Sequence, residues 1–209
     1  MQVFTCAKAL RAMAIITLLA GAFAAGTSNM ATAQSTTTPS GLQITDSKVG
    51  TGASPKTGQI CVMPSRLLIH ADIHDRLLAR VADIVRSHRV GDPLEDATFM
   101  GPMFTRGARD RVLDHVTRAV QGGASVAAGG SALDGEEMQG WFVEPTVVAD
   151  PDPDSALSQT ELFGPVIGGH RFTTEEEAVR IANGTEYGLA AYIQTRDIDR
   201  ALRVARALR

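Results

Sequence analysis

From residue 59 onward, the apolar positions alternate between a spacing typical of strands and a spacing typical of helices. Arg66–His70 is an apolar run of strand length, and apolar residues then recur at helical spacing from Ile73 to Val85. A second helical pattern runs from about Thr105 to Val120 and stops at a pair of glycines. The next residues, Ser125–Gly129, have the length of a short strand. This part of the chain therefore predicts strand, helix, helix and strand, in that order.

The C-terminal part continues the alternation. It predicts an extended segment at Phe142–Ala149, a strand at Gly164–Phe172, a helix begun by Thr174, a strand at Leu189–Gln194 and a helix capped by Asp197. Glu177 lies three residues after Thr174, which is the capping-box spacing. Strands that alternate with helices predict an α/β domain, with a parallel sheet flanked by helices. Because the chain stops at the end of a helix, we expect this sheet to be incomplete.

Residues 1–33 have the pattern of a signal peptide. Lys8 and Arg11 precede the uncharged apolar run Ala12–Ala25, and Ala31–Ala33 gives a small-x-small cleavage pattern. The run is shorter than the roughly 20 residues that a membrane span needs, and the alternative is an ordinary buried helix. A genuine leader predicts a periplasmic or secreted protein that has no membrane attachment after cleavage.

Residues 34–57 are rich in Ser, Thr, Gly and Pro, which predicts an unstructured linker with at most one short strand near Leu42–Ile44. Within it, Gly50–Thr57 has the spacing of a phosphate-binding loop. Pro55 stands where the second glycine should be, and it removes a backbone N–H from a loop that aims N–H groups at phosphate. We therefore do not predict a nucleotide site there.

Composition excludes some classes of function without selecting one. The 209 residues carry a formal net charge of -3 and only 5% aromatic residues, which argues against a nucleic-acid partner. The five histidines show no ligand spacing with carboxylates or cysteines, so no metal site is predicted. Glu175–Glu177 is interpreted as helix capping and the arginines of the last helix as a solvated face.

Cys61 is the candidate nucleophile, in the sequence Gly58-Gln-Ile-Cys61. A thiolate is the reactive form of cysteine, although a lone cysteine is more often a buried structural residue. Composition and spacing do not decide between a reactive nucleophile and a buried structural cysteine. Cys6 lies in the predicted leader and would be removed with it.

A series of phrases around Cys61 resembles the aldehyde dehydrogenase superfamily. Gly58–Arg66 is similar to the family's catalytic-cysteine segment, and Glu161-Leu-Phe163-Gly-Pro-Val is similar to its Glu-x-Phe-Gly-Pro motif. Further phrases occur in the family's order at Val90–Pro93, Met100–Pro102, Gly140–Thr146, Tyr187–Ala191 and Thr195–Ala201. The resemblance covers residues 58–209 and implies part of the family's catalytic domain.

The resemblance also implies a chemistry for these residues. The Cys61 thiolate would add to a small aldehyde to give a thiohemiacetal, then a thioester, on the way to a carboxylic acid. Glu161 would bind the nicotinamide-side ribose of NAD or NADP, and Phe163 would pack beside it.

Other parts of the family's machinery have no counterpart in this sequence. The general base in the family is a glutamate about thirty residues before the cysteine, whereas no glutamate precedes Glu95 here. The family's dinucleotide-binding domain and its upstream oxyanion asparagine are not found either. We therefore predict a chain that turns over no aldehyde, binds cofactor poorly and self-associates through an unpaired sheet edge. The parent family is mostly cytoplasmic, which conflicts with the leader.

The N-terminal segment has a resemblance of its own. Thr38–Gly52, continued through Gly58-Gln59, looks like the first strand of secreted FK506-binding-type prolyl isomerases, although the aromatic residues of the proline pocket do not follow. Two alternatives to the aldehyde dehydrogenase reading therefore stay open. One is an isomerase fragment, and the other is a non-catalytic chimeric product joined near residues 58–63.

Overall fold

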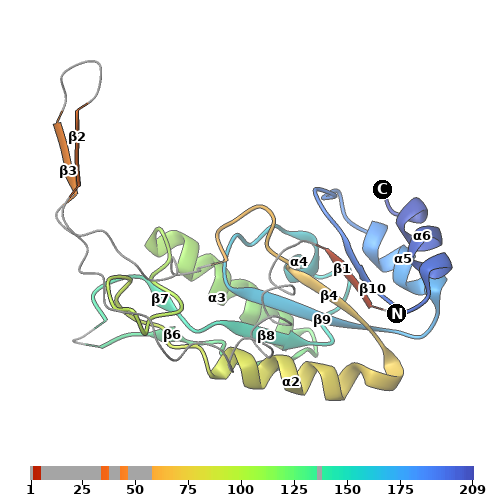
Figure 1. The fold of residues 1–209 in the computed structure, drawn as a ribbon. Helices are drawn as coiled ribbons and strands as arrows, with labels where there is room; N and C mark the ends of the chain where they lie inside the picture. The colour runs from red at the N-terminus through yellow and green to blue at the C-terminus, as the bar shows by residue number, and fades with distance from the viewer. Residues whose placement is uncertain (1, 6–33, 38–42, 47–57, 136–137) are drawn as a thin grey trace.

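The computed structural model describes residues 2–5, 34–37, 43–46, 58–135 and 138–209, and for the first three of these ranges it describes the backbone alone. A six-stranded sheet lies at the centre, in the order β10-β1-β4-β9-β8-β5 (Figure 1). Its strands are β1 (Gln2–Thr5), β4 (Arg66–His70), β5 (Ser125–Ala128), β8 (Thr146–Ala149), β9 (Val166–Phe172) and β10 (Tyr192–Gln194).

The predicted α/β class, with a parallel sheet flanked by helices, is confirmed for the middle of this sheet. Strand β9 pairs in parallel with β4 on one side and with β8 on the other. The sheet is mixed at its edges, because β5 is antiparallel to β8 and β1 is antiparallel to both β4 and β10. Antiparallel neighbours need no helical crossover. In the described residues between β5 and β8, the chain forms the short strands β6 (Ala132–Leu133) and β7 (Phe142–Val143).

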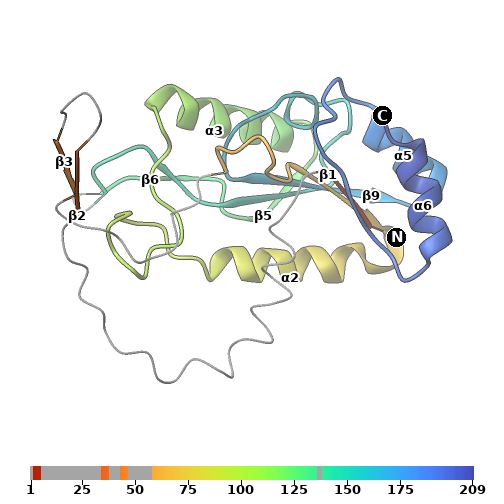
Figure 2. The ribbon, with the colours of Figure 1, turned by 45° about the horizontal axis from the view of Figure 1, so that its top comes forward.

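Helices cover both faces of the sheet because side chains of each strand alternate between the faces. Helix α2 (His74–Arg86) packs through Leu78 and Ala82 on Leu67 and Ile69. Leu68 points to the opposite face, where it packs with α5 (Glu175–Asn183) and α6 (Ile198–Ala207). Helix α3 (Arg106–Gln121) and the short α4 (Ala156–Gln159) pack on Val148 and Val166. Figure 2 shows α2 and α3 on opposite sides of the sheet.

The predicted helix starts are confirmed, with one difference at Thr174. Its hydroxyl accepts a hydrogen bond from the N–H of Glu177, and Asp197 accepts one from the N–H of Arg200. The Glu177 carboxylate, however, accepts from the backbone and hydroxyl of Thr173 rather than from Thr174. Glu175 lies in the first turn of α5, as expected, and its carboxylate also accepts two hydrogen bonds from Arg203 of α6, over 2.5 and 2.8 Å.

The predicted linker contains more regular structure than the single short strand expected. Strands β2 (Gln34–Thr37) and β3 (Gln43–Asp46) pair antiparallel with each other. Residues 2–5 of the predicted leader form β1, and residues 6–33 lie outside the described residues. The leader therefore stays a prediction. In the part of the chain that the structure describes, no helix combines the length and apolar character that crossing a bilayer requires.

Candidate functional site

A cleft of about 240 Å³ brings together three segments that are far apart in the sequence. The first contains the cysteine turn and the start of β4, the second leads from α4 into β9, and the third is the loop between α5 and β10. The lining includes Cys61, Glu161 and Phe163, the three residues singled out from the sequence, together with Tyr187 and Leu189. The three candidate residues therefore share one cleft.

Cys61 is exposed at the cleft and lies on a tight turn. The N–H of Met63 donates to the carbonyl of Ile60 over 2.9 Å, which closes the turn. Gln59 fixes the turn from the other side, because its Oε1 accepts a hydrogen bond from the N–H of Phe104 over 2.8 Å. These contacts hold the turn that carries the thiol, in the segment that leads into β4.

The second segment presents a carboxylate and an aromatic ring to the same space. Glu161 and Phe163 are exposed, and Leu162 between them is buried in the core around α3. Phe163 has a φ of 53°, in the left-handed region that non-glycine residues seldom adopt. This strained backbone conformation lies three residues before β9 begins at Val166. Backbone strain of this kind is common at binding sites.

The turn and the second segment touch through their glycines. Gly58 has a φ of 72°, and a Cβ added to it would lie 2.4 Å from the carbonyl oxygen of Gly164. Only a residue with no side chain permits this approach. The two sequence motifs are therefore packed directly against each other.

The third wall is the loop that follows α5, and sequence reasoning gave it no role in the site. Arg66 is buried, and its guanidinium donates to the carbonyls of Ile181 and Ala182 over 2.8 and 2.7 Å. These carbonyls lie in the last turn of α5, where a cation is favourable. Burial lowers the pKa of Arg66. The sequence showed an arginine at the start of a strand but gave no sign of its partners.

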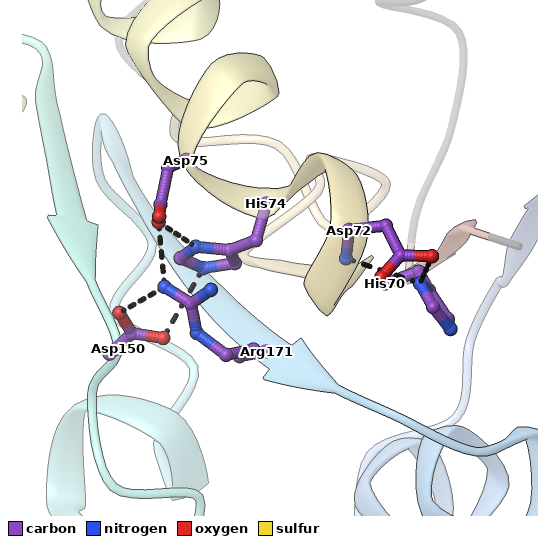
Figure 3. A network of polar contacts seen from close by, with 6 residues as sticks. All are labelled: His70, Asp72, His74, Asp75, Asp150 and Arg171. Atoms are coloured by element: carbon purple, nitrogen blue, oxygen red, sulfur yellow. Dashed lines mark hydrogen bonds and ion pairs between the residues drawn. The ribbon is translucent and has the colours of Figure 1, made fainter.

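A second polar cluster, drawn in Figure 3, lies at the ends of the parallel strands that are farther from the cleft. The imidazole of His74 is buried between two carboxylates, with Nδ1 2.9 Å from Asp75 and Nε2 3.3 Å from Asp150. Arg171 bridges the same carboxylates at 2.6 and 3.3 Å. Hydrogen bonds from His74 and then Arg171 lower the pKa of Asp75.

His74 and Asp75 follow β4 and Asp150 follows β8, whereas Cys61 precedes β4 and Glu161 precedes β9. Among the described residues, no group of three or more His, Cys, Asp or Glu side chains is arranged to hold a metal ion. We therefore interpret the cluster as a structural tie between α2, β8 and β9. The sequence gave no sign of this cluster, because contacting members such as Asp75 and Arg171 are 96 residues apart.

Comparison with known proteins identifies a family for most of the chain. The model of the aldehyde dehydrogenase family matches residues 42–209. An aldehyde dehydrogenase of Emericella nidulans is 38% identical over 152 residues, and a betaine aldehyde dehydrogenase of Brucella anthropi is 40% identical over 150. These alignments cover 73% and 71% of this chain but only 30% and 31% of the relatives. The chain thus spans about a third of their length.

Solved structures agree with these relatives. PnpE in complex with nicotinamide adenine dinucleotide has a TM-score of 0.69 at 42% identity, and the match covers 73% of this chain and 31% of that one. Betaine aldehyde dehydrogenase from Staphylococcus aureus, in complex with NAD⁺, has a TM-score of 0.69 at 35% identity over 73% of this chain and 30% of its own. The family match begins at residue 42, so it includes part of the predicted linker and of the isomerase-like segment.

Proposed function

Because the chain belongs to the aldehyde dehydrogenase family, we propose that residues 58–209 form the cysteine-bearing and ribose-binding part of an aldehyde-oxidising site. The observation that supports this proposal is the shared cleft of Cys61, Glu161 and Phe163. A thiol from the turn before β4 meets a carboxylate and an aromatic ring from the segment before β9, in the order that the family motifs predict.

The proposed first step is nucleophilic addition by Cys61. The thiolate attacks the carbonyl carbon of an aldehyde, the C–S bond forms, and the carbonyl electron pair moves to oxygen. The backbone N–H of Cys61 supplies one of the donors for this oxyanion. The exposure of Cys61 at the cleft makes the sulfur accessible to a small aldehyde.

The cleft suits one end of a dinucleotide better than a whole one. Its volume of about 240 Å³ is below the roughly 300–1,000 Å³ of most complete ligand sites. The Glu161 carboxylate is exposed and can accept hydrogen bonds from ribose hydroxyls, and the exposed Phe163 ring can pack beside a nicotinamide. NAD or NADP bound here would supply the hydride acceptor. The pyrophosphate and adenosine would need further protein surface.

We also propose that this chain by itself does not turn over an aldehyde. The sequence has no glutamate before Glu95 that could serve as the family's upstream general base. Removing a positioned general base typically slows a reaction by about 10²–10⁴. Nothing in the described residues favours the prolyl isomerase or chimera alternatives over this proposal. Export by a leader and association through an exposed sheet edge remain separate predictions.

The test of the proposed site is competition between an aldehyde and an alkylating reagent at Cys61. The full chain is treated with iodoacetamide in the presence or absence of betaine aldehyde, and alkylation is quantified on the peptide that contains Cys61. We expect the aldehyde to slow alkylation of the folded chain at Cys61 but not of the same chain in urea. The Cys61→Ser variant should match the wild type in showing no sustained NADH formation.

Equal protection of folded and unfolded chains would contradict the proposed thiol site. Sustained NADH formation that is lost in Cys61→Ser would contradict the proposal that the chain lacks turnover.

A further inference from the structure

Gln159 connects the two walls of the cleft through a single amide group. Its Nε2 donates to the carbonyl of Pro153 over 2.7 Å and to the carbonyl of Gly184 over 2.7 Å. Pro153 lies before α4, and Gly184 opens the loop that carries Tyr187 and Leu189. Both N–H groups of the primary amide are used, because an amide nitrogen has two protons to donate.

Each wall needs such a connection because neither is a long regular element. Helix α4 has four residues, and Glu161 follows two residues after Gln159. On the other wall, residues 184–191 form neither a helix nor a strand. Short elements and exposed loops open locally at little cost in free energy. A side-chain hydrogen bond between the two walls, such as that from Gln159 to Gly184, therefore restrains their separation.

Other side-chain hydrogen bonds act within the loop, from the N–H of Tyr187 to the hydroxyl of Thr185, or at the end of α5 that precedes it. Arg66 holds the last turn of α5 to β4. Asn183 donates to the carbonyl of Ala207 over 2.8 Å and accepts from the N–H of Arg209 over 3.0 Å, which ties the same end to α6. Gln159 differs from both because it joins the loop to the segment that contains Glu161 and Phe163.

We propose that Gln159 is a positioning residue that fixes the loop 184–190 relative to Glu161 and Phe163, and so sets the width of the cleft for a nicotinamide nucleoside. This inference rests on the proposed function for the identity of the ligand. The connection between the walls does not depend on that identity, so the two can be tested separately.

Three variants separate the hydrogen bonds from the packing of the side chain. Gln159→Met keeps an unbranched side chain of similar length and removes both donors. Gln159→Glu puts an acceptor against two carbonyl oxygens. Gln159→Lys restores donors at the end of the side chain, since an ammonium carries three N–H groups. A positioning role predicts loss in the first two variants and rescue in the third.

The first measurement is amide hydrogen exchange in residues 184–190 of the full chain. Loss of two hydrogen bonds, each of modest net value, should speed exchange there by about tenfold in Gln159→Met. Gln159→Lys should return within about twofold of the wild type by the same reasoning. Unchanged exchange in Gln159→Met, or no rescue by Gln159→Lys, would overturn the inference.

The second measurement is the dissociation constant of nicotinamide mononucleotide together with the rate of Cys61 alkylation. A positioning role predicts weaker nucleotide binding in Gln159→Met, by about tenfold, with the alkylation rate unchanged, because Cys61 lies on the turn before β4. A general loss of structure would change both quantities, which would overturn the inference. If the wild type binds no nucleotide, the proposed ribose site is wrong, and the exchange experiment still decides the role of Gln159.

Discussion

At the scale of single residues, the site depends on how closely two backbone segments can approach. Gly58 and Gly164 lie where the cysteine turn meets the second segment of the cleft, and a Cβ on Gly58 would also lie 2.7 Å from the nitrogen of Pro165. Backbone atoms cannot give way as the end of a flexible side chain can. The positions of Cys61 and Glu161 relative to each other therefore depend on a glycine at 58.

The variant Gly58→Ala tests this dependence. The left-handed φ of 72° alone costs a residue with a Cβ about 1–2 kcal/mol, and the clash with Gly164 adds to it. We expect the free energy of unfolding, measured by urea denaturation, to fall by more than about 1 kcal/mol. The matched control is Gly107→Ala in α3, where an added Cβ meets nothing within 4 Å. That change should be neutral or stabilising by up to about 1 kcal/mol, and an equal loss in both variants would contradict the argument.

The sequence predicted some residues of the site and could not predict others. Cys61, Glu161 and Phe163 belong to recognisable motifs, so their common cleft could be anticipated. Arg66 and Gln159 act through backbone carbonyls 115 and 25 residues away, respectively. Backbone carbonyls carry no sequence signal, because every residue has one. Such contacts become visible only in the folded chain.

At the scale of elements, periodicity and capping predicted the longer helices and strands. Thr174 and Asp197 begin α5 and α6 as expected, and the predicted extended segment Phe142–Ala149 contains β7 and β8, with Pro145 between them. The short elements α4 and β6 were missed, since four or two residues are too few to show a period. The direction of β5 was also not predictable, because alternation of apolar residues is the same in parallel and antiparallel strands.

Strand β9 carries a buried titratable group in its middle. His170 is 2% exposed, and burial, together with the nearby charge of Arg66, lowers its pKa to about 4. The unfolded chain therefore takes up this proton more readily than the folded one. The contribution of the neutral His170 side chain to stability is complete above about pH 6.5 and is lost progressively as the pH falls toward about 4.

We predict that the free energy of unfolding falls by up to about 3 kcal/mol between about pH 6.5 and about pH 4. Each unit by which folding lowers the pKa of His170 corresponds to about 1.4 kcal/mol. Asp75 and Glu175 have a lowered pKa as well, so their loss comes at more acidic pH. Urea denaturation at a series of pH values measures the slope. The variant His170→Gln should reduce the dependence of the free energy of unfolding on pH in this window. An unchanged pH dependence in this variant would show that other groups cause it.

At the scale of the whole molecule, the parallel strands β4, β9 and β8 assemble the site from distant parts of the chain (Figure 1). The residues just before β4 and β9 meet at one end of these strands and form two walls of the cleft. The polar cluster of His74, Asp75, Asp150 and Arg171 ties the other end together. The family resemblance predicted this α/β centre, whereas the place of β1 between β4 and β10 had no signal in the sequence.

The measurement that tests the central claim most directly is a short cysteine-to-cysteine cross-link across the cleft. In a Cys6→Ser background, Glu161→Cys supplies a second thiol beside Cys61, and Glu176→Cys, at an exposed position of α5 outside the cleft lining, supplies the control. A short bifunctional maleimide should join Cys61 to the thiol at 161 within one chain, and it should not join Cys61 to the thiol at 176. Failure at 161 in a folded chain, or equal yields at both positions, would contradict a shared cleft.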